Sequence, residues 1–277
     1  MTAAEALAWA SRRLREAGVE GPERDARILL AHALGVDRAR LVLMLPEPVP
    51  EAARRRLEAA VAARAARQPV AQIIGERLFH GLRLKVTPDV LDPRPETETL
   101  VETALAAPFG RVLDLGTGSG AILLALLAAR PEATGLGTDI SEAALAVARE
   151  NARRLELEQR ASFRRADWWE GITGRFDLIV SNPPYIGEAE IAALAPETRD
   201  WEPRAALTPG ADALAAYRAI AAGAAEHLAP QGRLIVETGA GQAEEVARIF
   251  AAAGLLDPRL VADLDGRPRV VAATAPQ

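Results

Sequence analysis

Apolar residues over the first 69 positions recur every three or four places, which is the spacing of amphipathic helices. Thr2 and Glu5 have the spacing of a capping box in front of the first such run. Pro22 begins a second run and Gly35 ends it, in keeping with the preference of proline for helix starts and of glycine for helix ends. We therefore expect residues 1–69 to form a small helical bundle.

At residue 70 the pattern changes to strand-like apolar runs. Residues 70–79 and residues 82–86 are such runs, and His80 with Gly81 between them is a turn signal. Two short strands joined by a tight turn pair with each other, so we expect residues 70–93 to contain a β-hairpin that links two domains.

From residue 94 onward, short apolar runs alternate with helical patterns, as in sheets that have helices on both faces. The runs expected to form strands are residues 111–115, 134–138, 161–166, 176–181, 233–238, 259–262 and 269–273. The last two runs leave no room for a helix between them, so they should pair antiparallel. We expect residues 94–277 to form an α/β domain whose seven-stranded sheet is mostly parallel, doubly wound and closed by an antiparallel hairpin.

A side-chain amide and two prolines follow the buried run 176–181. Asn182, Pro183, Pro184 and Tyr185 should therefore lie at the carboxyl edge of the sheet, where open α/β sheets bind their ligands. The prolines fix φ and remove two backbone donors, which leaves carbonyl oxygens free to accept from a ligand. This arrangement suits a planar group with two N–H donors, such as an amide or an exocyclic amine. The simpler alternative is a turn after a strand.

A glycine-rich turn follows the run 111–115 and precedes a helical pattern. It consists of Gly116, Thr117, Gly118, Ser119 and Gly120. The spacing differs from that of a dinucleotide fingerprint, and no P-loop lysine follows. Because glycines have no Cβ, a ligand can lie against this backbone at the start of the next helix.

Acidic residues occur at the ends of three successive expected strands. Asp114, next to the glycine turn, disfavours a pyrophosphate and suits a cationic amino or sulfonium group. Asp139, followed by Ile140, lies where a carboxylate can accept from both hydroxyls of a ribose. The alternative for each acid is helix capping or surface charge, and Ser141 already offers a cap after Asp139.

The third acid, Asp167, is followed by two tryptophans. A carboxylate there can accept from an adenine amino group, and Trp168 or Trp169 can stack on the ring. The three acids and the glycine turn together predict an adenosine ligand with a positively charged tail, which describes S-adenosylmethionine.

Composition narrows the class of protein. An apolar content of 49% over 277 residues is enough for a substantial core, and the net charge of −5 argues against a nucleic-acid-binding surface. Cysteine is absent and the three histidines are isolated, so we expect neither disulfides nor a metal site. No signal core or apolar run of membrane-spanning length occurs. We expect a monomeric cytoplasmic protein with no membrane contact and no stable nucleic-acid partner.

The site motifs resemble those of class I S-adenosylmethionine-dependent methyltransferases that act on planar nitrogens. The motifs are the run 114–120, Asp139 and the run 182–185. By themselves they also fit adenine-N6 DNA methyltransferases. The segment 93–98, the helical N-terminal part and the run 236–239 followed by Gln242 narrow the resemblance to the release factor glutamine methyltransferase family.

This resemblance implies a function and a role for each part of the chain. Members of that family methylate the side-chain amide nitrogen (N5) of the glutamine in the Gly-Gly-Gln motif of peptide chain release factors, which act in translation termination. Residues 1–69 would recognise the release factor, and residues 94–277 would form the methyltransferase domain.

The implied residues fall into three groups. Asn182, Pro183 and Tyr185 would be catalytic, with the Asn182 oxygen and the Pro183 carbonyl each accepting one N–H of the substrate amide. The cofactor would contact Asp114, Gly116, Thr117, Gly118, Gly120, Asp139, Ile140, Asp167, Trp168 and Asn182. The substrate would contact Asn182, Pro183, Pro184, Tyr185, Arg94 and Glu96.

One position departs from the family pattern, and three other functions stay open. Ala213 stands where members usually have a glycine, which matters only if φ there is positive. The alternatives are a ribosomal-protein glutamine methyltransferase, an adenine-N6 nucleic-acid methyltransferase and a catalytically silent binding domain. A dehydrogenase is disfavoured by the glycine spacing and by Asp114.

Overall fold

The computed structural model describes residues 1–276, so position 277 of the expected α/β domain lies outside the described residues. The chain divides into two compact units. Met1–Glu76 forms the first unit together with Ala195–Trp201. Arg77–Leu194 and the described residues from Glu202 onward form the second.

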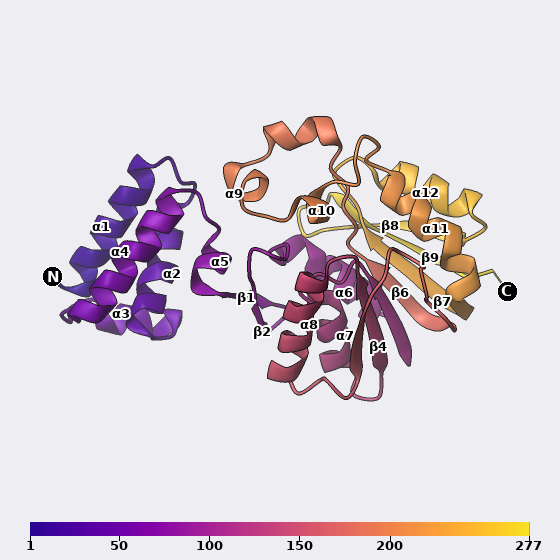
Figure 1. The fold of residues 1–277 in the computed structure, drawn as a ribbon, viewed down its shortest axis with the longest axis horizontal. Helices are drawn as coiled ribbons and strands as arrows, with labels where there is room; N and C mark the ends of the chain where they lie inside the picture. The colour runs from indigo at the N-terminus through magenta and orange to yellow at the C-terminus, as the bar shows by residue number, and fades with distance from the viewer. Residues whose placement is uncertain (277) are drawn as a thin grey trace. The chain divides into compact units, whose positions relative to one another are not determined.

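The first unit is helical, as the spacing of apolar residues predicts (Figure 1). Its elements are α1 (Ala3–Glu16), α2 (Pro22–Leu34), η1 (Arg38–Arg40), α3 (Leu41–Met44), α4 (Glu51–Ala65), α5 (Val70–Ile74) and α9 (Pro196–Arg199). The Thr2 hydroxyl accepts from the Glu5 backbone N–H, and the Glu5 carboxylate accepts from that of Thr2, so the predicted capping box is confirmed. Gly35 ends α2 in the left-handed conformation, with φ of 68°.

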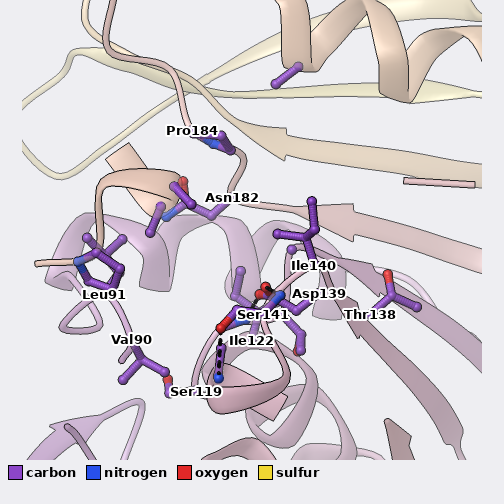
Figure 2. A pocket seen from close by; sticks show the side chains of 18 of the residues that line it. Val90, Leu91, Ser119, Ile122, Thr138, Asp139, Ile140, Ser141, Asn182 and Pro184 are labelled. Carbon is purple, nitrogen blue, oxygen red and sulfur yellow. Dashed lines mark hydrogen bonds between the residues drawn. The ribbon is translucent and has the colours of Figure 1, made fainter. Parts of the chain in front are cut away.

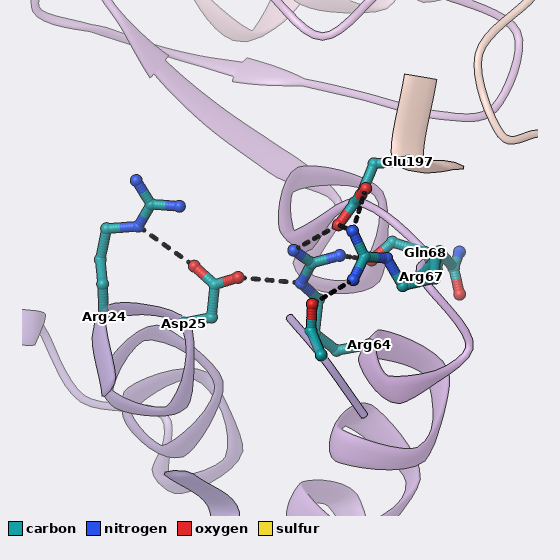
Figure 3. Close-up of polar contacts among 7 residues, drawn as sticks. Arg24, Asp25, Arg64, Arg67, Gln68 and Glu197 are labelled. Atoms are coloured by element: carbon teal, nitrogen blue, oxygen red, sulfur yellow. Dashed lines mark hydrogen bonds and ion pairs between the residues drawn. The ribbon is translucent and has the colours of Figure 1, made fainter. Parts of the chain in front are cut away.

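Buried charge joins α2, α4 and α9 within this unit (Figure 3). Arg64 is buried and donates from Nε to Asp25 Oδ2 over 2.8 Å. Arg64 and Arg67 also both reach the Glu197 carboxylate. Because buried charges must be paired, these contacts explain why a segment so distant in sequence belongs to the helical unit.

The strand expected over residues 70–79 is partly wrong. Val70–Ile74 is helix α5, and Gly75 ends it with φ of 76°. Pro69 caps the start of this turn of helix, which packs against α2, and tertiary contact outweighs the strand preference of its branched residues. The hairpin itself is present, because β1 (Glu76–Phe79) pairs with β2 (Leu82–Lys85) in a two-stranded sheet.

The second unit is built on a seven-stranded sheet with the order β5-β4-β3-β6-β7-β9-β8. Its strands are β3 (Arg111–Leu115), β4 (Thr134–Asp139), β5 (Ala161–Arg165), β6 (Phe176–Ser181), β7 (Leu228–Glu237), β8 (Leu256–Ala262) and β9 (Pro268–Thr274). The strands from β3 to β7 pair parallel, and β9 pairs antiparallel with both β7 and β8. The predicted doubly wound sheet with a closing antiparallel hairpin is confirmed.

Helices cover both faces of this sheet (Figure 1), and the buried side chains form one core layer on each face. Val112 and Leu178 face the layer formed with α6 and α7, whereas Leu113 and Ile179 face the layer formed with α11 and α12. The remaining elements of this unit are η2 (Pro95–Thr97), α6 (Glu98–Leu105), α7 (Ala121–Ala129), α8 (Glu142–Arg154), η3 (Glu188–Ala193), α10 (Arg204–Leu207), α11 (Ala215–His227) and α12 (Ala243–Ala252). Within residues 1–276, no helix has the length and apolar character needed to cross a membrane.

Candidate active site

A cavity of about 500 Å³ lies at the carboxyl edge of the sheet, where the strand order reverses between β3 and β6. Open α/β sheets bind ligands at this point, and the volume falls within the range of small-molecule sites. Figure 2 shows Asn182 and Pro184 on one side of this cavity and Asp139 and Ser141 on another. The predicted site residues in its wall are Arg94, Gly116, Thr117, Gly118, Asp139, Ile140, Asp167, Trp168, Asn182 and Pro184.

The glycine-rich turn presents backbone to the cavity. Gly116 and Gly118 have φ of 70° and 54°, a left-handed conformation that a side chain would strain. The Thr117 hydroxyl donates to Asp114 Oδ2 over 2.6 Å and holds the turn against the end of β3. A ligand in the cavity can therefore approach the turn more closely than it could approach an ordinary loop.

Asp114 lies behind this turn and not in the cavity wall. Its side chain is fully buried, and burial raises its pKa to about 7. The Thr117 hydroxyl and the Leu123 backbone N–H offset only part of that rise in pKa. The structure thus gives Asp114 a direct part in shaping the turn, and Gly120 likewise lies outside the wall, at the N-cap of α7.

Asp139 lies in the cavity wall with both carboxylate oxygens held by backbone donors. Gly118 N–H donates to Oδ2 and Ser141 N–H donates to Oδ1, each over 2.9 Å. Burial raises the pKa of this carboxyl, and the backbone hydrogen bonds oppose the rise. Each oxygen keeps a second lone pair, so the carboxylate is fixed in position and can still accept from hydroxyl groups in the cavity.

The structure separates the two tryptophans that the sequence left equivalent. Trp168 is half-buried in the cavity wall beside Asp167, and its φ of 49° is unusual for a bulky residue. Trp169 turns away, stacks on His227 with ring centroids 4.7 Å apart, and donates from Nε1 to the Ala219 carbonyl over 2.8 Å. Only Trp168 is thus placed to stack on a ring in this cavity.

Asn182 follows β6 and belongs to a chain of three polar side chains. Its Nδ2 donates to Thr97 Oγ1 over 3.2 Å, and the Thr97 hydroxyl donates to Glu237 Oε2 over 2.5 Å. Thr97 lines the cavity and Glu237 is buried behind it. The segments that contain Thr97 and Glu237 contributed to the family resemblance. The sequence alone assigned neither residue a place in the site.

Tyr185 and Pro183 lie outside the cavity wall, although their neighbours Asn182 and Pro184 line it. The Tyr185 carbonyl accepts from Gln242 Nε2 over 2.9 Å, which ties the loop after β6 to the start of α12. Burial, with a further contribution from the Glu237 charge, raises the pKa of Tyr185 to about 12. The phenol therefore stays neutral at physiological pH.

Arg94 lies in the cavity wall, and Glu96 is exposed outside it. The Arg94 guanidinium donates from Nη2 to Glu202 Oε2 over 2.6 Å, and Glu202 Oε1 accepts from the Asp92 backbone N–H over 3.2 Å. The buried Glu202 thus holds the arginine in place. Among residues 1–276, no group of three or more His, Cys, Asp or Glu side chains is arranged to bind a metal ion.

Comparison with known proteins identifies the family. A family model described as "PrmC N-terminal domain" matches residues 5–75, and one described as "Methyltransferase small domain" matches residues 90–197. A release factor glutamine methyltransferase of Cereibacter sphaeroides is 59% identical over 100% of this chain and 99% of its own length. The chain belongs to the release factor glutamine methyltransferase family.

A further relative supports this membership of the family, and a solved structure supports the fold. A member from Rhodospirillum rubrum is 50% identical over 96% of this chain and 82% of its own. The crystal structure of a methyltransferase from Pyrococcus furiosus aligns with a TM-score of 0.54 at 16% identity, over 78% of this chain and 96% of that one. At this low identity the structural likeness supports the methyltransferase fold alone.

The position that departs from the family pattern is accommodated without strain. The backbone φ at Ala213 is not positive, so an alanine is tolerated at this position, where the resemblance led us to expect a glycine. The Ala213 Cβ lies close to Gly187, at the start of η3. The substitution therefore does not distort the loop that follows Asn182.

Proposed function

We propose that this protein transfers a methyl group from S-adenosylmethionine to the side-chain amide nitrogen of the glutamine in the Gly-Gly-Gln motif of release factors. One observation supports this proposed function most directly. Asn182, followed by Pro-Pro-Tyr, lies in the same cavity wall as the glycine turn and Asp139, so an amide and a nucleoside can occupy one cavity. Membership of the family supports the choice of acceptor.

The cavity fits an adenosine-containing cofactor with a cationic tail. The Asp139 carboxylate would accept from the ribose hydroxyls, Trp168 and Ile140 would contact the adenine, and Asp167 would accept from its amino group. The left-handed turn at Gly116 would lie against the tail. When bound, S-adenosylmethionine supplies an electrophilic methyl group on a sulfonium.

The protein's contribution to the reaction is to orient the acceptor amide. Its nitrogen is a poor nucleophile because its lone pair is delocalised into the carbonyl. The Asn182 Oδ1 would accept one N–H, and the Pro183 carbonyl would accept the other, which aims the nitrogen along the line of attack. Alignment of two reactants contributes up to roughly 7–11 kcal/mol of barrier reduction in well-oriented systems.

Tyr185 would support this geometry without titrating. With its pKa raised to about 12, the phenol is neutral and offers an apolar ring beside the amide plane. The amide nitrogen becomes acidic once it gains the methyl group, so water can take the proton and no histidine base is required. The helical residues 1–69 would recognise the release factor, and Arg94 and Glu96 would contact its backbone near the glutamine.

Methyl transfer to a panel of acceptors tests this function. Purified protein is incubated with methyl-labelled S-adenosylmethionine and, in separate reactions, with a release factor, a ribosomal protein or duplex DNA. We expect label on the release factor and its loss when the Gly-Gly-Gln glutamine is changed to alanine. Label only on the ribosomal protein or the DNA would overturn the acceptor, and absence of label on all three, despite binding of the cofactor, would indicate a catalytically silent domain.

A further inference from the structure

The hydrogen-bonded chain from Asn182 to Glu237 extends from the cavity wall into the protein interior. Thr97 is 4% exposed and Glu237 is 2% exposed, so water does not compete for their contacts. The two lie at the ends of different elements, η2 and β7, and are separated by 140 residues in sequence. Ser181 and Val236 are partners in the β6–β7 ladder, so the next residues, Asn182 and Glu237, lie at the same level of the carboxyl edge.

The number of available protons fixes the direction of the two hydrogen bonds that join Asn182, Thr97 and Glu237. When Glu237 is ionised its carboxylate can only accept, so the single hydroxyl proton of Thr97 must then point at Glu237 Oε2. The Thr97 oxygen then has only lone pairs to offer to Asn182. The side-chain amide of Asn182 must therefore present its NH₂ group to Thr97, as the 3.2 Å contact from Nδ2 has it.

The opposite orientation of the amide would remove the proposed catalytic contact. The two ends of an asparagine amide have nearly the same shape, so packing alone selects weakly between the two orientations. If the amide were reversed, NH₂ would meet the N–H of the substrate amide and repel it. We propose that Thr97 and Glu237 are positioning residues that hold the Asn182 amide with its oxygen available to the substrate. This inference rests on the proposed function.

Hydrogen bonds hold the backbone segment that begins at Glu237. Glu237 is the last residue of β7, and its backbone carbonyl accepts from the Tyr217 hydroxyl over 3.3 Å. The Gly239 N–H, two residues later, donates to Gln242 Oε1 over 3.1 Å, while Gln242 Nε2 holds the Tyr185 carbonyl. The same short segment therefore supports both ends of the Asn-Pro-Pro-Tyr motif.

Protonation of Glu237 would loosen the constraint. Burial raises the pKa of this carboxyl to about 7, the charges of Arg269 and Arg94 lower it, and that of Glu96 raises it. Tyr185 also faces this carboxylate, and it stays neutral. A protonated Glu237 could donate to Thr97, whose own proton could then turn to Asn182 Oδ1 and favour the reversed amide. The hydrogen bonds from Asn182 through Thr97 to Glu237 should thus lose their fixed direction as the pH falls below about 7.

Substitutions at the two positioning residues test the proposal in the full-length protein. T97V removes the hydroxyl at nearly constant shape, T97S keeps it, and E237Q replaces the obligate acceptor by an amide that can also donate. We expect T97V and E237Q to lower kcat on the release factor about tenfold, the effect of losing one well-placed hydrogen bond. We expect KM for S-adenosylmethionine to stay within about twofold of wild type, and T97S to recover most of the loss.

A matched control separates positioning from stability. Thr103 lies on α6 and donates to the Thr99 carbonyl inside the helix, so T103V also removes a partly buried threonine hydroxyl. It should leave kcat unchanged. Thermal unfolding of all variants identifies any that fail to fold, and E237Q, which removes the cost of a buried charge, serves if T97V is unstable.

A double-mutant cycle gives a readout that a merely structural role would not move. If Thr97 acts through Asn182, adding T97V to N182A should cost no further activity, whereas independent effects would multiply.

The pH profile gives a second such readout. The wild-type kcat/KM should rise with pH through a titration near pH 7 that E237Q abolishes.

The outcomes distinguish the two claims. A wild-type protein that methylates no release factor would overturn the proposed function. A wild-type protein that does so, with T97V and E237Q equally active or with T97V and N182A fully multiplicative, would overturn the positioning proposal alone.

Discussion

Arg64 and Glu197 form an ion pair with 2.9 Å between Nη2 and Oε1, and the Arg64 side chain is only 6% exposed. Helix α9, which contains Glu197, follows the loop that begins at Asn182. The contact therefore explains why this helix, which follows the Asn-Pro-Pro-Tyr motif in the sequence, belongs to the helical unit.

Loss of this pair should destabilise the protein. E197A leaves the buried Arg64 with Asp25 as its remaining acidic partner and removes the carboxylate acceptor of Arg67, which also donates to the Gly18 carbonyl. We expect the free energy of unfolding to fall by about 1–3 kcal/mol, as for a lost hydrogen bond to a charged group, measured by urea denaturation of the full chain. E16A removes the exposed pair with Arg13 in the same unit and should cost less than about 1 kcal/mol. Equal effects of E197A and E16A would contradict a structural role for the buried pair.

Asn182 should be needed for turnover and not for cofactor binding. N182A removes the proposed acceptor of a substrate N–H, and loss of one preorganised contact to a reacting group costs about 2.7–4 kcal/mol. We expect kcat on the release factor to fall roughly 100- to 1,000-fold while the Kd of S-adenosylmethionine changes little. N182D keeps an acceptor oxygen and should retain more activity than N182A. Normal turnover by N182A would refute the assignment.

Trp168 should contribute to cofactor affinity, and Trp169 should contribute to stability. Stacking of a base on an aromatic ring is worth about 1–3 kcal/mol, so W168A should weaken the Kd of S-adenosylmethionine roughly 5- to 150-fold in a calorimetric titration. W169F loses the hydrogen bond to the Ala219 carbonyl and should lower the melting temperature with little change in Kd. A reversed result, with affinity lost only in W169F, would exchange the two roles.

The buried carboxyl of Asp114 should make stability depend on pH. Its folded pKa, raised to about 7, exceeds the ordinary value of 3.8, so its favourable contribution is fully present below that ordinary value. That contribution is lost as the pH rises through about 7, and the difference can amount to at most about 4 kcal/mol. We expect the free energy of unfolding of the wild type to fall more steeply between about pH 4 and about pH 7 than that of D114N. Parallel curves would show that Asp114 does not titrate in this range.

The central strands could be predicted with their bounds because they are buried on both faces. Residues 111–115 and 176–181 read as nearly continuous apolar runs, and they coincide with β3 and β6. β7 begins earlier than expected, at Leu228 and not at residue 233. The Pro-Gln-Gly sequence before residue 233 signals a turn, but it forms an irregularity inside the strand, where Gln231 has φ of 63°.

The side chains that reach the cavity could be predicted only where they follow a strand. Asp139, Trp168 and Asn182 lie in the cavity wall because parallel strands end at a common edge. Thr97 and Glu237 gave no comparable signal, since their contact depends on two elements distant in sequence. The choice between Trp168 and Trp169 likewise depends on backbone conformation, which adjacent identical residues do not reveal.

The most direct test of the account is to locate the transferred methyl group by tandem mass spectrometry. Release factor is incubated with the wild-type protein and S-adenosylmethionine, and the peptide that contains Gly-Gly-Gln is fragmented. The account predicts one added methyl group on the side-chain nitrogen of that glutamine. A methyl group on any other residue, or an unmodified peptide after complete consumption of the cofactor, would contradict it.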